Sequence, residues 1–178
     1  MAAIQRSIDD GPIVLQTDSV RLRPTTADDL DFVVQTEQDE DNRPFVGQWP
    51  RERHRDTCAE PNAAHLIIET IADRRAVGYV ILTGLGDANE TVELLRIVVS
   101  DKGQGHGRAT LQLIKRFVFE ELMAHRLWLD VRDHNIRARR LYESEGFLVE
   151  GTLRESTKVG ERFESLVIMS MLAHEYQT

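Results

Sequence analysis

The segment that most constrains this chain is a glycine-rich loop, Lys102-Gly103-Gln104-Gly105-His106-Gly107-Arg108. It follows the largely apolar run 94–99 and precedes a stretch with helical periodicity, which predicts a strand, a glycine loop and a helix in that order. Glycines allow a bend that points successive N–H groups one way, and the helix start adds unpaired N–H groups and the positive end of its dipole. The loop is therefore predicted to bind an anion, most simply the phosphates of a ligand.

Two well-known phosphate motifs do not match this loop. The P-loop of NTPases has a lysine directly after its last glycine, whereas Arg108 follows Gly107 here. The dinucleotide motif has the spacing Gly-x-Gly-x-x-Gly and an acidic residue for the ribose, and neither is present. On the loop alone, a glycine-rich turn without a ligand remains open.

Composition and charge limit the function classes. The chain has 178 residues, within the range of one domain, and a formal net charge of −8, so no basic face for nucleic acid is expected. Its one cysteine, Cys58, cannot form an internal disulfide, which favours a reducing compartment. The sequence has neither a signal peptide nor an apolar stretch of membrane-spanning length, so we expect a cytoplasmic protein without a membrane partner.

The periodicity predicts one mixed α+β domain over residues 1–178. Strands are expected over residues 20–24, 64–70, 76–82, 91–99, 127–131, 147–153 and 163–172, and helices over residues 26–37, 50–59, 107–122 and 135–144. The strand–helix–strand unit from 91 to 131 should be parallel with a right-handed crossover. Residues 1–18 have weak periodicity and are predicted to be a loose arm or a short edge segment.

A second motif lies one strand after the glycine loop. Residues 135–147 read Asn-x-x-Ala-x-x-Leu-Tyr-x-x-x-Gly-Phe, and Lys102, Gly105 and Gly107 match the pattern Gln/Arg-x-x-Gly-x-Gly/Ala. With both motifs at this spacing, the chain resembles the GNAT superfamily of acetyl-CoA-dependent N-acetyltransferases. Lysine at position 102 departs from the pattern, because it keeps the positive charge but loses the planar fork of arginine.

The resemblance covers residues 20–172 and implies a single GNAT-like domain. Its fold is expected to be α+β, with a mixed central sheet of about seven strands and helices on both faces. The segments 150–155 and 169–172 resemble the branch that contains the ribosomal-protein N-terminal acetyltransferases. Dimers are common in the superfamily, so the resemblance also allows a homodimer.

The resemblance implies acetyl-CoA as the acetyl donor. Its pyrophosphate would lie on the glycine loop, and the pantetheine arm would bind backbone groups of the preceding strand. The basic cluster after residue 131 is either a solvated helix face or supplies a contact to the 3′-phosphate, a role assigned to Arg140. The expected donor-binding residues are Ile97, Val98, Val99, Lys102, Gly103, Gln104, Gly105, His106, Gly107, Arg108, Ala109, Asn135 and Arg140. The histidines have no metal-ligand spacing, so no metal is expected.

Three residues are candidates for the chemistry. The resemblance places Tyr142 beside the coenzyme sulfur as general acid, although a core aromatic is the alternative. Asn135 is expected to bind the pantetheine arm, cap the helix that begins there, or do both. Glu93 is the candidate general base, with a solvated acid at the strand end as the alternative. Strict alternation would put Glu93, Leu95 and Ile97 on one face of the strand and Leu94 and Arg96 on the other.

The predicted reaction is direct attack of a primary amine on the thioester, in a sequential mechanism. The sequence leaves the acceptor open among a protein N-terminus, a polyamine, an amino acid and another small amine. Phe45 and Trp49 either line the acceptor pocket or anchor the early helices to the sheet. The competing interpretation is a non-catalytic acetyl-CoA-binding sensor or regulatory module.

Overall fold

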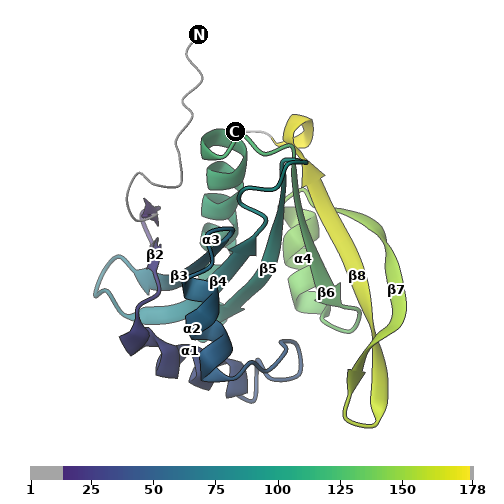
Figure 1. The fold of residues 1–178 in the computed structure, drawn as a ribbon, viewed down its shortest axis with the longest axis horizontal. Coiled ribbons are helices and arrows are strands. Elements are labelled where there is room, and N and C mark those ends of the chain that lie inside the picture. The colour runs from purple at the N-terminus through teal and green to yellow at the C-terminus, as the bar shows by residue number, and fades with distance from the viewer. Residues whose placement is uncertain (1–13, 177–178) are drawn as a thin grey trace.

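The computed structural model describes residues 14–176 and contains one eight-stranded sheet (Figure 1). The spatial order is β1-β2-β3-β4-β5-β6-β8-β7. The strands are β1 Leu15–Gln16, β2 Val20–Pro24, β3 Ala63–Thr70, β4 Ala76–Thr83, β5 Thr91–Val99, β6 Arg126–Arg132, β7 Leu148–Val159 and β8 Arg162–Leu172. Only β5 and β6 pair in parallel, which confirms the predicted parallel unit.

The ends of the sheet differ from the prediction in two details. Leu15–Gln16 pairs with β2 as a short edge strand, which raises the predicted seven strands to eight. The rest of the predicted N-terminal arm, residues 1–13, lies outside the described residues. Strand β7 continues to Val159, beyond its predicted end at residue 153, because it stays paired with β8 as far as the turn.

Helices cover both faces of the sheet, as predicted (Figure 1). Helices α1 and α2 pack on one face, where Val33 joins Tyr79 and Ile81 in a buried cluster. Helices α3 and α4 pack on the other, where Leu111 and Tyr142 belong to the larger core. The helices are α1 Leu30–Gln38, α2 Arg51–Cys58, α3 His106–Arg116 and α4 Ile136–Ser144, with short 3₁₀ or π segments at Ala27–Asp29, Phe117–Glu121 and Ala173–Glu175. In the described part of the chain, none of these helices has the length and apolar character needed to cross a membrane.

A bulge in β5 changes the alternation of its side chains. Strand β4 pairs Ile81 with Arg96 and the next residue, Leu82, with Leu94, so Leu95 is the extra residue on β5. A bulge of this kind leaves one residue unpaired and shifts the pleat by one position. Side chains on either side of Leu95 therefore do not follow strict alternation.

The bulge overturns the predicted grouping of faces on this strand. Leu94 and Ile97 both contact the larger core, although three positions separate them. Glu93 and Arg96 consequently lie together on the opposite face, the one that α1 and α2 cover. The predicted face shared by Glu93 and Ile97 is wrong, because the pattern of β5 alone does not reveal the bulge.

Strands β5 and β6 separate soon after they meet. Their pairing is limited to Thr91–Glu93 with Arg126–Trp128, whereas β6 remains paired with β8 up to Arg132. Beyond these pairs the two strands diverge (Figure 1). The backbone groups of 94–99 on that side of β5 therefore have no neighbouring strand.

Candidate active site

A cavity of about 810 Å³ lies where β5 and β6 diverge. Most of its wall comes from four parts of the chain: β5 residues 94–99, the glycine loop, the end of β6 with α4, and the segment 41–53 that leads into α2; Thr157 of β7 and Leu166 of β8 complete it. The first three walls contain the two sequence motifs. The fourth wall belongs to the segment before residue 60, which carried no motif.

The glycine loop has the conformation that the sequence predicted. Gly103 and Gly105 have φ values of 84° and 81°, and Gly105 is the N-cap of α3. The first N–H that bonds back into the loop is that of Ala109, 3.0 Å from the Gly105 carbonyl oxygen. The amides of Gly103, Gly105 and Gly107 have no acceptor within residues 14–176. They are available to an anion at the start of α3.

Changing Gly105 to alanine is expected to weaken acetyl-CoA binding about tenfold, because a Cβ in this left-handed conformation costs about 1–2 kcal/mol. Titration calorimetry with acetyl-CoA measures the effect. Gly151→Ala is the matched control, since a Cβ there meets no atom within 4 Å and its φ is not positive. Equal dissociation constants for Gly105→Ala and the wild type would contradict the role of the loop.

The basic residues of the loop differ in whether they already have partners. Lys102 lines it, with Nζ 3.8 Å from Oδ2 of Asp41, and burial lowers its pKa. His106 also lines it, and its buried Nδ1 has no partner within the described residues. The guanidinium of Arg108 instead pairs with Glu145. Arg108 nevertheless lines the cavity, with its guanidinium already engaged by this ion pair.

The structure brings together most of the predicted site residues. Those on the cavity wall are Ile97, Val98, Val99, Lys102, Gly103, Gly105, His106, Gly107, Arg108, Asn135 and Tyr142. Glu93, Gln104, Ala109 and Arg140 are not among the lining residues. Arg137, on the same helix as Arg140, lines the cavity and is the better placed cation for a phosphate.

Tyr142 reaches the cavity from the buried side of α4. The residue is 7% exposed and packs against Phe147, with 5.9 Å between the ring centroids. Burial and the nearby charge of Asp130 raise its pKa, so the phenol is protonated at neutral pH. Tyr142 is thus a core aromatic whose protonated phenol also lines the cavity.

Asn135 begins α4 and also lines the cavity. Its Oδ1 accepts a hydrogen bond from the N–H of Ala138 at 3.2 Å, so it caps the helix as expected. The cap uses only the side-chain oxygen, which leaves the NH₂ group as a donor. The capping role is therefore compatible with a contact to the donor substrate.

Two carboxylates lie on the α1–α2 side of the strands that bound the cavity. Glu93 accepts a hydrogen bond from Thr83 Oγ1 at 2.9 Å, and its pKa is raised, chiefly by burial. Asp130 lines the open cavity without an ion-pair partner among residues 14–176. Desolvation by the surrounding protein raises the pKa of Asp130, and the charges of Arg132 and Arg96 lower it by a smaller amount.

The sequence interpretation missed Asp130. Leu127, Leu129 and Val131 point into the larger core, so alternation directs Asp130 to the other face of β6, toward the side of Glu93. The available signal was a single acid within an otherwise apolar strand pattern. Asp130 lies where the two strands diverge, and this position depends on the pairing of β5 with β6 rather than on the sequence of β6 alone.

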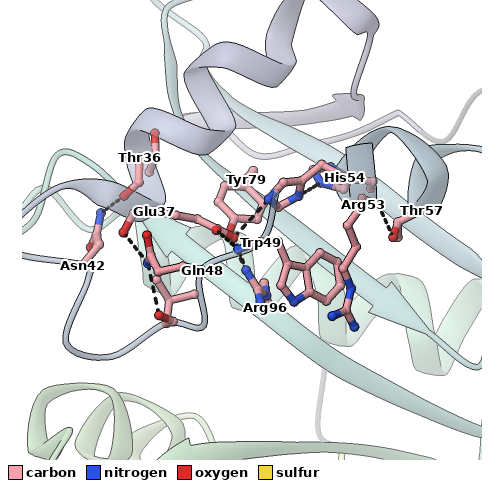
Figure 2. Close-up of polar contacts among 12 residues, drawn as sticks. Thr36, Glu37, Asn42, Gln48, Trp49, Arg53, His54, Thr57, Tyr79 and Arg96 are labelled. Carbon is pink, nitrogen blue, oxygen red and sulfur yellow. Dashed lines mark hydrogen bonds and ion pairs between the residues drawn. The ribbon is translucent and has the colours of Figure 1, made fainter. Parts of the chain in front are cut away.

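The fourth wall is held by a buried carboxylate, Glu37, at the end of α1 (Figure 2). Glu37 is 1% exposed and accepts hydrogen bonds from the Tyr79 hydroxyl at 2.5 Å and the Trp49 backbone N–H at 2.9 Å. It also pairs with Arg96. Burial alone would raise the pKa of Glu37, but His54 and Arg96 outweigh burial and lower it.

Glu37 therefore fixes Trp49 at the cavity. Trp49 lines the cavity and also packs against the cluster beneath α1 and α2, so it anchors this segment to the sheet, as one of the two interpretations expected. Phe45 lines the cavity as well and is 38% exposed. The buried carboxylate of Glu37 thus positions Trp49 on this wall.

Two buried histidines continue the polar network from Glu37, the first of which is His54 (Figure 2). His54 Nε2 lies 3.2 Å from a Glu37 oxygen, and His54 Nδ1 lies 3.0 Å from His65 Nε2. His65 Nδ1 in turn lies 2.8 Å from Thr25 Oγ1. Burial and the neighbouring His54 lower the pKa of His65 to about 3. No set of three or more His, Cys, Asp and Glu side chains in the described residues is arranged to hold a metal ion.

Comparisons with known proteins agree with this geometry. The sequence model of the acetyltransferase (GNAT) family matches residues 34–147. The spermidine N(1)-acetyltransferase of Vibrio cholerae serotype O1 is 27% identical over 116 residues, which are 65% of this chain and 67% of that protein. The family match includes the glycine loop and nearly all of the cavity wall.

Solved structures share the whole fold. A spermidine N-acetyltransferase from Vibrio cholerae in complex with CoA and spermine superposes with a TM-score of 0.80 at 21% identity, covering 89% of this chain and 98% of that one. A GNAT-family acetyltransferase from Bacillus anthracis gives 0.78 at 17% identity, covering 91% and 99%.

The family model spans more than half of the chain, and the matched segments meet at one site in the structure. Strand β5, the glycine loop and α4 carry both motifs, and they meet around the cavity. The chain therefore belongs to the acetyltransferase (GNAT) family and is an acetyl-CoA-dependent N-acetyltransferase.

Proposed function

We propose that this enzyme transfers the acetyl group of acetyl-CoA directly to a primary amine of a small molecule or a protein N-terminus. The observation that carries the proposal is the single cavity that joins the glycine loop to Tyr142. The donor and the acceptor can meet there without a covalent enzyme intermediate. Cys58, the one cysteine, is exposed and outside the cavity lining.

The residues present fit the donor substrate. The unpaired amides of the glycine loop, Lys102 and the unpartnered His106 Nδ1 suit a pyrophosphate. The backbone of 97–99, which has no neighbouring strand on the cavity side, suits the amide groups of pantetheine. A backbone N–H near the thioester would stabilise the developing oxyanion.

The chemistry needs one base and one acid. A neutral amine nitrogen attacks the thioester carbon, so a nitrogen–carbon bond forms and the carbon–sulfur bond breaks. The leaving thiolate takes the proton of Tyr142, and the nitrogen loses its extra proton to the base. Tyrosine suits the role of the acid because it is fully protonated at neutral pH.

We assign the base to Asp130 and retain Glu93 as the alternative. Asp130→Asn is expected to lower kcat about tenfold or more and to remove the acidic limb of the pH–rate profile. In the wild type, kcat/KM should fall as the pH decreases through the raised pKa of this carboxylate, because the base must be ionised. Profiles of both proteins with the same amine measure the change.

Glu93→Gln is the matched comparison, because it neutralises a carboxylate on the same face that lies outside the lining. An acidic limb that persists in Asp130→Asn and disappears in Glu93→Gln would transfer the role to Glu93. A limb present in both variants would exclude both carboxylates.

The chemical class of the acceptor is proposed from the relatives and from the residues that line the cavity. The two relatives from Vibrio cholerae are named as spermidine acetyltransferases, which favours a small amine, while the branch of ribosomal-protein N-terminal acetyltransferases remains a prediction. A homodimer and a cytoplasmic location also remain predictions.

Thiol release from acetyl-CoA with a panel of amines and peptides tests the proposal against the sensor alternative. We expect release that depends on both the enzyme and an amine. Heat protection by acetyl-CoA without transfer to any acceptor would instead support the sensor.

A further inference from the structure

The indole of Trp49 lies between two guanidinium groups (Figure 2). Cζ of Arg53 is 3.7 Å from the ring centroid and Cζ of Arg96 is 4.0 Å from it. Two guanidiniums at these distances over one ring must occupy opposite faces, because they would clash on the same face. Trp49 therefore has no open face for the ammonium of a substrate, although it lines the cavity.

The two arginines differ in how their charge is balanced. Arg96 is buried and pairs with Glu37. Arg53 is exposed on α2 and lines the cavity, and no carboxylate of residues 14–176 forms an ion pair with it. Its N–H groups are available for a planar anionic group.

Most other charges on the cavity wall already have partners. Lys102 lies near Asp41, Asp101 pairs with Arg75 at 2.6 Å, and Arg132 pairs with Glu164 at 2.7 Å. Asp130 is the acid on this wall without an ion pair among the described residues. Two cations on the wall, Arg53 and Arg137, have no ion pair among the described residues. Arg137 lies near Lys102 of the glycine loop, on the side proposed for the phosphates, which leaves Arg53 as the unpaired cation for the acceptor and Asp130 as the unpaired anion.

From this charge pattern we infer that the acceptor is a small amine that also carries a carboxylate, which Arg53 binds. The amine then lies on the side of Asp130, where the base is proposed. The inference rests on the proposed function and narrows its acceptor class. A polyamine has no group for Arg53 and would place a further cation beside it.

The test compares three amines of similar size: lysine, lysinamide, which has a neutral amide in place of the carboxylate, and cadaverine, which has neither. We expect the wild-type kcat/KM for lysine to exceed the values for the other two amines about tenfold. One charge-assisted hydrogen bond to the carboxylate accounts for a difference of this size. Arg53→Gln should lose this preference by lowering the value for lysine alone. Arg53→Lys should retain part of it, because the charge remains.

Arg55→Gln is the control, since Arg55 is an exposed arginine of the same helix, paired with Asp56 and outside the lining. It should leave all three kcat/KM values unchanged. A wild type that prefers cadaverine, or an Arg53→Gln variant that slows all three amines alike, would overturn the inference and leave the acetyltransferase proposal standing. Absence of transfer to these and all other amines would overturn both.

Discussion

Tyr142→Phe is expected to lower kcat about 100-fold, the lower end of the usual range for a general acid. The variant removes the hydroxyl that we propose protonates the leaving thiolate, and it keeps the ring that packs against Phe147. The affinity for acetyl-CoA should stay close to that of the wild type, since the glycine loop is unchanged. Steady-state kinetics and titration calorimetry together separate the two quantities.

Tyr176→Phe is the matched control for this substitution. Its hydroxyl bonds to Glu120 at 2.7 Å, outside the cavity lining, so its removal should leave kcat unchanged. An unchanged kcat for Tyr142→Phe across the pH range would contradict the general-acid role. Tyr142 would then be a core aromatic only.

Glu37→Ala is expected to lower the free energy of unfolding by about 3–5 kcal/mol, the usual effect of removing one partner of a buried ion pair. The change leaves the buried charge of Arg96 unpaired, and it removes the acceptor of the Tyr79 hydroxyl and the Trp49 N–H. Urea denaturation followed by circular dichroism measures the loss. The KM for the acceptor should also rise, because Trp49 loses its support.

Asp31→Ala is the comparison for Glu37→Ala. Asp31 pairs with Arg51 at 2.9 Å on the surface, with its side chain 75% exposed. Such pairs contribute less than about 1 kcal/mol. If Glu37→Ala costs no more than Asp31→Ala, the network around Glu37 does not stabilise the wall.

Local patterns were sufficient for the shape of the glycine loop and the start of α4. The positive φ values at Gly103 and Gly105 and the cap at Asn135 are properties of short segments, and the structure has them where the sequence predicted them. Parallel pairing of the flanking strands then brings the loop and Tyr142 to one cavity. The two motifs predict these local conformations because each motif is contained within one loop and one helix.

The acceptor side could not be predicted in this way. Glu37 ends the helix predicted over 26–37 and carries no motif, and its burial depends on Tyr79 and Arg96, which are 42 and 59 residues away. The bulge at Leu95, which brings Arg96 to the face of Glu37, arises from pairing with β4. Asp130 matters only because β5 and β6 diverge beside it.

The most direct test of the account is mass spectrometry of an amine after incubation with the enzyme and isotopically labelled acetyl-CoA. We predict a product that carries one labelled acetyl group on nitrogen, formed by the wild type and about 100-fold more slowly by Tyr142→Phe. Label that appears on the protein as an obligatory intermediate, or no labelled amine from any acceptor, would contradict direct transfer in this cavity.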